Sequence, residues 1–232
     1  MPGPRELPVL SRAEVRELDR RAIEDYGLPG VVLMENAAAG AARWMLDRHG
    51  PGRRVIIACG GGNNGGDGYA LARHLSNAGW EVQLLACVAP DALAGDAAVM
   101  ARVARAMHLA CSRFDGELRA TLAAPELIVD ALLGTGFRAP LRPEIAAAIE
   151  ALNALRRARA EALIALDLPS GLDADSGLAS VPCIRADATL SFAALKPGLL
   201  APRAREQVGE LVCIDIGAPR AILEALLAER RA

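Results

Sequence analysis

The stretch that most constrains the fold is residues 59–75, CGGGNNGGDGYALARHL, in which positions 60–68 are all glycine, asparagine or aspartate. It follows the apolar run of residues 55–58, which is typical of a buried parallel strand. It precedes Leu71 and Leu75, whose spacing predicts a helix. This order predicts a strand, a glycine-rich turn and a helix, with the backbone amides of the turn facing a ligand.

The residues around the glycines narrow the kind of ligand. Gly60, Gly62 and Gly65 have the G-x-G-x-x-G spacing of dinucleotide-binding folds, which by itself is a weak signal. The acid that binds the ribose in those folds, about 20 residues further on, is missing, because the nearest acid after the next apolar run is Asp91. No lysine follows to form a P-loop, and we expect Asp67 to cap the helix. An ordinary NAD-dependent dehydrogenase therefore fits poorly.

The rest of the chain alternates between strand and helix patterns. Ser11 and Glu14 form a capping box that opens a first helix, and a second helix is expected over residues 31–48. Further strands are predicted at 81–88, 109–112, 127–133, 162–166, 188–192 and 211–216, and further helices at 95–107, 117–123, 143–157 and from 219 onward. Because strands and helices alternate, we predict an α/β fold with right-handed crossovers and a mostly parallel sheet covered by helices on both faces. We expect residues 1–232 to form a single domain.

Composition excludes several classes of partner. The 232 residues carry a formal net charge of -2 and only 3% aromatic side chains, so neither nucleic acid nor an anionic membrane surface is an expected partner. There is no apolar signal core and no run of 18 apolar residues, which predicts a soluble, cytoplasmic protein. The widely spaced cysteines are expected to be buried free thiols in a reducing compartment: Cys59, Cys87, Cys111, Cys183 and Cys213.

Polar side chains follow three of the predicted strands, at the edge of the sheet where ligands bind in such folds. Asp130 and Asp167 each end an apolar run, and a buried carboxylate needs a cation, hydrogen-bond donors or a proton. Few lysines or arginines lie near these loops, so we expect a metal ion or backbone amides to satisfy both. Asn64, Asp130 and Ser170 would form an all-oxygen site for a hard cation. The histidines lack the spacing of transition-metal ligands.

Three other polar residues leave two interpretations open. Glu35 and Asn36 stand near the start of the second predicted helix, and they face either solvent or the ligand cleft. Lys196 is either a lysine on a surface loop or a functional residue. No G-x-S-x-G motif is present, so the covalent chemistry of hydrolases is not expected.

Four motifs together resemble the NAD(P)H-hydrate epimerase family: NNGGDG, VDALLGTGF, ALDLPSGLDADSG and FAALKPGLL, spread from residue 63 to residue 200. The resemblance implies a three-layer αβα Rossmann-like fold preceded by two N-terminal helices. It implies an isomerase of metabolite repair that interconverts the R and S epimers of hydrated NADH and NADPH. Members fused to a dehydratase domain exist, so pairing with a separate dehydratase is left open, as is a homodimer.

The resemblance also implies roles for individual residues. The potassium ligands of the family match Asn64, Asp130 and Ser170. The substrate-binding positions match Asn63, Asn64, Gly65, Gly66, Asp67, Gly134, Thr135, Gly136, Phe137, Arg138, Ala139, Pro140 and Asp167. We expect acid–base catalysis by Asp167, with its pKa raised by burial, and otherwise by Asp67 or Lys196. The alternatives are a non-catalytic nucleotide- or RNA-binding scaffold of the same fold and an enzyme that acts on another adenylate.

Overall fold

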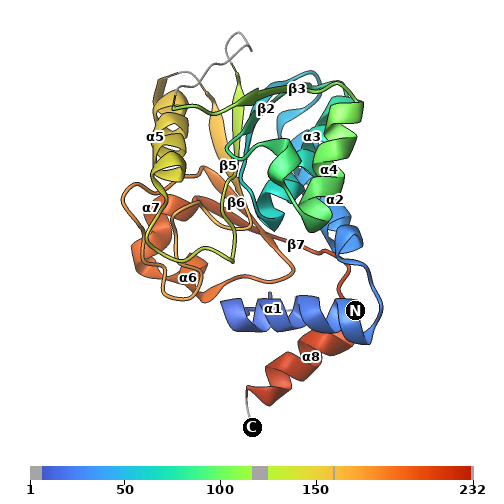
Figure 1. Ribbon diagram of the computed structural model, residues 1–232. Helices are drawn as coiled ribbons and strands as arrows, with labels where there is room; N and C mark the ends of the chain where they lie inside the picture. Colours follow the sequence, from blue (N-terminus) through green and yellow to red (C-terminus); the bar gives the residue numbers. More distant parts are fainter. Residues whose placement is uncertain (1–6, 117–124, 159, 231–232) are drawn as a thin grey trace.

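The computed structural model describes residues 7–116, 125–158 and 160–230 (Figure 1). A seven-stranded sheet runs through it in the order β3-β2-β1-β4-β5-β6-β7, and every neighbouring pair is parallel. The strands are β1 (Arg54–Cys59), β2 (Glu81–Ala86), β3 (Ala110–Arg113), β4 (Leu127–Ala131), β5 (Ala162–Leu166), β6 (Ala188–Phe192) and β7 (Glu210–Ile214). The strand order reverses between β1 and β4, where folds of this kind bind ligands. The predicted parallel sheet is confirmed.

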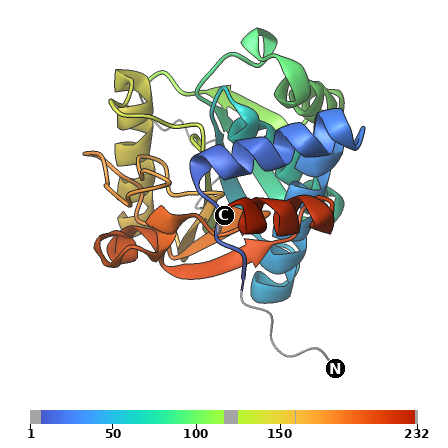
Figure 2. The same cartoon turned by 90° about the horizontal axis from the view of Figure 1, so that it is seen from below.

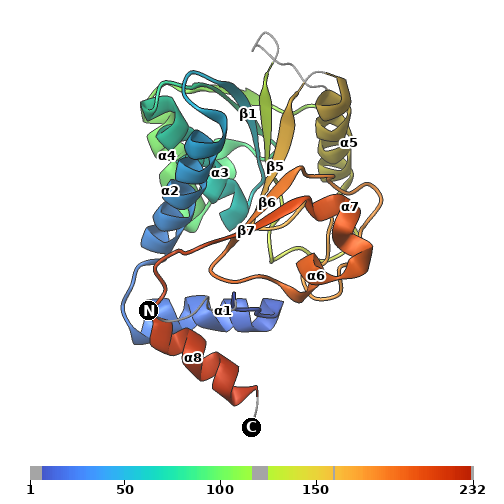
Figure 3. The ribbon, with the colours of Figure 1, turned by 180° about the vertical axis from the view of Figure 1, so that it is seen from behind.

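Helices cover both faces of the sheet, as predicted. In Figures 1 and 3, α2 (Gly30–His49), α3 (Asn63–Asn77) and α4 (Gly95–Ala106) lie on one face, and α5 (Pro143–Ala158) lies on the other. Strand β1 shows why both faces must be covered. Its Val55, Ile57 and Cys59 pack with α2 to α4, whereas Ile56 and Ala58 pack with α5. Two short helices, α6 (Pro197–Leu200) and α7 (Arg205–Val208), were not predicted from the sequence.

The N-terminal helix α1 (Arg12–Arg20) crosses the edge of the sheet beside the C-terminal helix α8 (Arg220–Glu229), as Figure 2 shows from below. The predicted capping box is present: the Ser11 N–H donates to Glu14 Oε2 (2.7 Å), and the Glu14 N–H donates to Ser11 Oγ (3.4 Å). A single π-helical turn, Arg21–Asp25, follows α1. Leu18 is buried in the main core, which fixes α1 against the rest of the molecule.

The glycine-rich stretch differs from the prediction in one respect. Helix α3 already begins at Asn63, so only residues 60–62 form the turn. The later glycines allow close packing of this helix, because a Cβ on Gly65 would overlap the carbonyl oxygen of Gly60. The predicted cap is wrong as well: the N-cap position is Gly62, and Asp67 lies in the second turn of the helix.

Three other expectations have mixed outcomes. All five cysteines are free, but only Cys59 is buried, and Cys111 is exposed because it lies on the edge strand β3. The predicted helix at 117–123 lies outside the described residues. Within the described part of the chain, no helix has the length and apolar character needed to cross a membrane.

Candidate functional site

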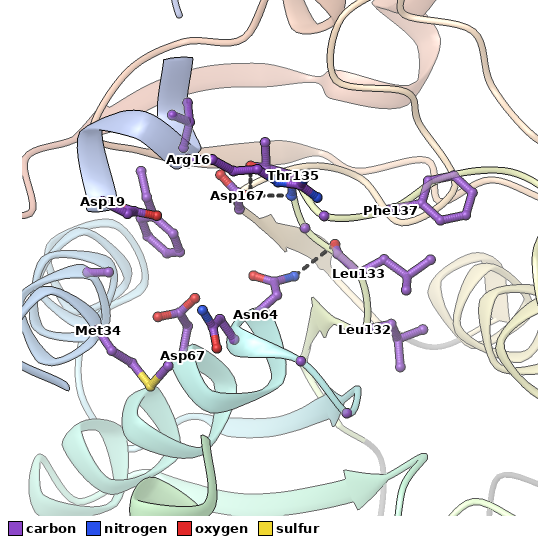
Figure 4. Close-up of a pocket in the computed structure, with 18 of the residues that line it drawn as sticks. Arg16, Asp19, Met34, Asn64, Asp67, Leu132, Leu133, Thr135, Phe137 and Asp167 are labelled. Atoms are coloured by element: carbon purple, nitrogen blue, oxygen red, sulfur yellow. Dashed lines mark hydrogen bonds between the residues drawn. The ribbon is translucent and has the colours of Figure 1, made fainter. Parts of the chain in front are cut away.

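A cavity of about 900 Å³ opens where β1, β4 and β5 end. Its walls come from the loops after these strands, from the start of α3, and from α1 and α2 (Figure 4). The predicted meeting of three loops at this edge is therefore observed. Of the substrate-binding residues expected from the sequence, those that line the cavity are Asn63, Asn64, Asp67, Gly134, Thr135, Gly136, Phe137, Arg138, Pro140 and Asp167.

The remaining predicted residues lie around the cavity but do not line it. Gly65 and Gly66 pack inside α3, where a Cβ on Gly66 would come within 2.7 Å of the sulfur of Met34. Ala139 borders a smaller neighbouring pocket instead. The predicted metal ligands Asp130 and Ser170, together with Lys196, are fully buried beneath the cavity wall.

Asp167 is held in an unusual backbone conformation by a full set of donors. Its φ is +64°, in the left-handed region that a non-glycine residue rarely adopts. The Lys196 ammonium forms an ion pair with Oδ1. The Thr135 N–H (2.7 Å) and the Thr135 hydroxyl (2.5 Å) donate to Oδ2. Both carboxylate oxygens of Asp167 are therefore occupied.

These contacts contradict one expectation from the sequence and decide one question that the sequence left open. Burial opposes ionisation of Asp167, but the Lys196 charge and the Thr135 donors outweigh it, so the pKa of Asp167 is lowered rather than raised. Lys196 is not a surface lysine, since its side chain is 0% exposed. Its ammonium also donates to Ser191 Oγ (3.1 Å) and to the Phe192 carbonyl (2.9 Å). Lys196 is 29 residues from Asp167 in sequence, which is why the ion pair between them could not be predicted from the motifs.

Asp67 has the opposite character. Burial, with the nearby charges of Asp167 and Asp19, raises the pKa of Asp67 well above its usual value. Among the described residues, none donates a hydrogen bond to its carboxyl group. Asp67 therefore favours its protonated form far more than an ordinary aspartate does, whereas Asp167 favours its ionised form. Two carboxyl groups with separated pKa values in one cavity are the usual arrangement of an acid–base site.

Sequence reasoning missed the part of the cavity that α1 supplies. Arg16 and Asp19 of this helix line it, as does Arg142, which follows the second motif. A signal for Asp19 existed: it lies at i+4 from Val15 and next to Leu18, on the apolar face of the helix. An acid on the inward face of an amphipathic helix needs either a partner or a function.

Buried oxygen atoms gather beneath the cavity around the Leu133 carbonyl. That carbonyl accepts from Asn64 Nδ2 (2.9 Å) and lies 3.4 Å from Ser170 Oγ. The Ser170 hydroxyl donates to Asp130 Oδ1 (2.6 Å), and the Ser170 and Leu132 N–H groups donate to the same carboxylate (2.8 and 3.1 Å). Burial raises the pKa of Asp130 to about 6, against these opposing hydrogen bonds. Asn64 Oδ1 is buried and has no hydrogen-bond partner among the described residues.

The open question about Glu35 and Asn36 is settled by their contacts. Glu35 forms ion pairs with Arg73 and His74 on the outer side of α3. Asn36 donates to the Ile216 carbonyl (2.9 Å) and is otherwise exposed. Neither residue lines the cavity, so the solvent-facing interpretation is correct for both.

Comparison with known proteins shows the family of this chain. Residues 30–198 match the family described as YjeF-related protein N-terminus. The chain is 42% identical over 219 residues to the Rhodopirellula baltica protein named NAD(P)H-hydrate epimerase, covering 94% of this chain and 88% of that one. It is 43% identical over 223 residues to the Pirellula staleyi protein of the same name, covering 94% and 96%.

Two further similarities concern length and fold. A Moorella thermoacetica protein named bifunctional NAD(P)H-hydrate repair enzyme is 38% identical, and the match covers 96% of this chain but 43% of that protein. The solved structure of the yeast protein YNL200c is similar in fold, with a TM-score of 0.80 at 23% identity, covering 95% of this chain and 93% of the yeast chain. By its sequence similarity over nearly its whole length, this chain belongs to the NAD(P)H-hydrate epimerase family, within the YjeF-related N-terminal group.

Proposed function

We propose that this protein is an isomerase that interconverts the R and S epimers of hydrated NADH and NADPH. The observation that carries this proposal is a cavity lined by two carboxyl groups with different contacts, in a chain of this family. Asp67 accepts no hydrogen bond from the described residues, whereas Lys196 and Thr135 hold Asp167. The cavity volume, about 900 Å³, is at the upper end of the range for small-molecule sites and suits a dinucleotide.

The chemistry follows from the structure of the substrate. Its hydroxyl group is on the ring carbon beside the nitrogen, so that carbon resembles a hemiaminal. When the hydroxyl leaves as water, the nitrogen lone pair forms a planar iminium ion. Water that then adds to the other face gives the inverted epimer. The reaction needs an acid for the departing oxygen, a base for the incoming water and stabilisation of the cation.

The cavity residues supply these functions. Asp67, whose pKa is raised by burial and whose carboxyl group accepts no hydrogen bond from the described residues, protonates the departing hydroxyl. Asp167, fixed and ionised, stabilises the positive charge of the iminium ion across the cavity. Lys196 is a positioning residue, because it is buried behind Asp167 and does not line the cavity. Asn63, the start of α3 and the loop from Gly134 to Pro140 bind the remainder of the nucleotide.

A monovalent cation, potassium, would be held by the oxygens beneath the cavity. Such an ion fits Asn64 Oδ1, the Asp130 carboxylate and Ser170 Oγ. Asn64 Oδ1 is buried without a donor among the described residues, and the buried Asp130 carboxylate pairs with no described lysine or arginine. A single formal charge among neutral oxygens suits a weakly hydrated ion better than magnesium. The bound ion would order the loops that carry Asn64, Leu133 and Ser170. No group of three or more His, Cys, Asp or Glu in the described residues is arranged for another metal.

The competing interpretation, a non-catalytic scaffold, is not favoured, because the cavity keeps the loop asparagines and both acids. The bifunctional relatives imply that the product epimer passes to a dehydratase, so we propose functional pairing with a separate dehydratase. We also propose a cytoplasmic location and a homodimer. Light scattering of the purified protein would test the homodimer.

The direct test is an epimerisation assay. Hydrated NADH enriched in the R epimer is mixed with the purified protein, and the epimer ratio is followed by chromatography. We expect equilibration many times faster than in buffer, without a change in total hydrate or in redox state. Equilibration at the buffer rate would show that the proposed function is wrong.

A further inference from the structure

Asp19 is a further carboxyl group in the cavity besides Asp67 and Asp167, and it comes from an element outside the matched family segment. Helix α1 ends before residue 30, where that match begins. Figure 4 shows Asp19 reaching the cavity from α1 and Asp67 reaching it from α3. The two carboxyl groups therefore approach a bound molecule from different elements of the cavity wall.

The contacts of Asp19 differ from those of Asp167. Both oxygens of Asp167 accept from Lys196 or Thr135. Among the described residues, by contrast, none forms a hydrogen bond or an ion pair with the Asp19 carboxyl group. The side chain is half-buried and faces the cavity. An acid of this kind can exchange a proton with a bound molecule without first giving up a structural contact.

We propose that Asp19 is the second acid–base residue of the epimerase and serves the face of the substrate ring opposite to Asp67. This inference rests on the proposed function. Inversion demands such a pair, because the hydroxyl departs from one face and water adds to the other, and one fixed carboxyl group cannot reach both.

The proton balance closes over one turnover. The Asp67 carboxyl group gives its proton to the departing hydroxyl, and the C–O bond breaks to yield water, the iminium ion and an Asp67 carboxylate. Water forms a C–O bond to the opposite face and gives a proton to the Asp19 carboxylate. The substrate is neither oxidised nor reduced. Exchange with solvent then returns the proton to Asp67, and the reverse reaction uses the same two groups in exchanged roles.

The charges that face Asp19 set the pH at which this pair works. Burial and the Asp167 charge raise the pKa of Asp19 to about 6, with Lys196 opposing. The pKa of Asp67 lies well above its usual value, chiefly because the group is buried. The other charged side chains around the cavity are Arg16, Asp96, Arg138 and Arg142. We expect a bell-shaped pH profile for kcat/KM in both directions, with its acid limb near pH 6.

The test separates inversion from oxygen exchange. Each purified epimer is incubated in ¹⁸O-water, and both epimers are recovered and analysed by mass spectrometry. In Asp19→Asn we expect inversion to fall roughly 10²–10⁴-fold. Exchange of ¹⁸O into one epimer without inversion should persist, because Asp67 still serves its own face. That residual exchange should lack the acid limb near pH 6, and Asp19→Glu should recover part of the inversion.

Controls make the outcomes distinct. Glu17→Gln alters an acid on the same helix that pairs with Arg20 outside the cavity, and it should epimerise like the wild type. NADP⁺ binding and thermal melting are measured for Asp19→Asn and for a second variant, Asp19→Ser. Wild-type inversion in either variant would overturn the proposal. The proposal would also be overturned if Asp19→Asn lost ¹⁸O exchange as well as inversion, or lost NADP⁺ binding as well as inversion. An inactive wild type would instead refute the proposed function.

Discussion

The raised pKa of Asp67 links the stability of the fold to pH. Its pKa in the folded state lies above its ordinary value of 3.8, so the folded state holds this proton more tightly than the unfolded chain does. The stability that this group contributes is present below pH 3.8 and is lost as the pH rises through the raised pKa. The contribution of Asp67 to the stability of the fold therefore decreases as the pH rises toward neutrality.

Asp67→Asn should separate activity from stability. The amide has the same shape but cannot transfer the proton, so kcat should fall roughly 10²–10⁴-fold. The melting temperature should decrease less than that of the wild type between pH 5 and pH 8, because the amide has no proton to lose. Asp91→Asn, which changes an exposed acid, is the matched control. If folded Asp67→Asn kept a kcat near that of the wild type, Asp67 would not be the acid of the reaction.

The Asp167–Lys196 pair should be strongly coupled. In Lys196→Met a buried carboxylate loses its cation, and we expect urea unfolding to show a loss of about 3–5 kcal/mol. Asp167→Asn should cost less, and the double variant should recover much of the loss caused by Lys196→Met. Additive losses in this double-mutant cycle would show that the two side chains do not stabilise each other.

At the scale of the element, the loops after β1, β4 and β5 contact one another through side chains. Asn64 at the start of α3 reaches the Leu133 carbonyl, and Ser170 after β5 reaches the Asp130 carboxylate at the end of β4. These contacts leave Asn64 Oδ1 without a donor among the described residues. Isolated elements could not hold this arrangement, because each loop supplies one part of the oxygen cluster.

The proposed cation should therefore stabilise the loops as a unit. We expect potassium chloride to raise the melting temperature of the wild type relative to tetramethylammonium chloride at equal ionic strength, whereas Asp130→Asn should lose this difference. Asp175→Asn, an exposed acid outside the cluster, should keep it. An equal potassium effect in wild type and Asp130→Asn would rule out this site.

At the scale of the whole molecule, the cavity joins segments from most of the chain. Residues of α1, the start of α3 and the loops after β4 and β5 line a single space, although more than 140 residues separate Asp19 from Asp167 in sequence. The edge strand β3 and the short helix α7 contribute no residue to it.

Ligand binding should consequently protect distant segments together. With NADP⁺ as the probe, hydrogen–deuterium exchange should slow in α1, in residues 60–68, 134–140 and 167–173, and not in β3 or α7. Wild type without ligand is the reference, and adenine alone tests whether the nicotinamide end is needed to protect α1. Protection confined to one of the three loops would show that the cavity does not bind the dinucleotide as a whole.

The sequence by itself determined the layered architecture. Apolar runs such as residues 162–166 and 188–192 became strands with those same limits, because a strand buried on both faces leaves little freedom for its residue types. The four motifs also contain the lining residues that follow β1, β4 and β5, such as Asn64, Thr135 and Asp167, since loops at the carboxyl edge of a parallel sheet must meet. These features depend on local pattern and on the topology that follows from it.

Only the tertiary structure decided the protonation of the site. Asp167 was expected to carry a raised pKa, but Lys196, 29 residues further on, forms an ion pair with it and lowers the pKa. Asp67 was expected to cap a helix, but α3 starts earlier and buries it. Asp19 was not singled out, because its importance depends on where α1 crosses the sheet. A pKa is set by burial and by charges within a few ångströms, and these distances exist only after the chain has folded.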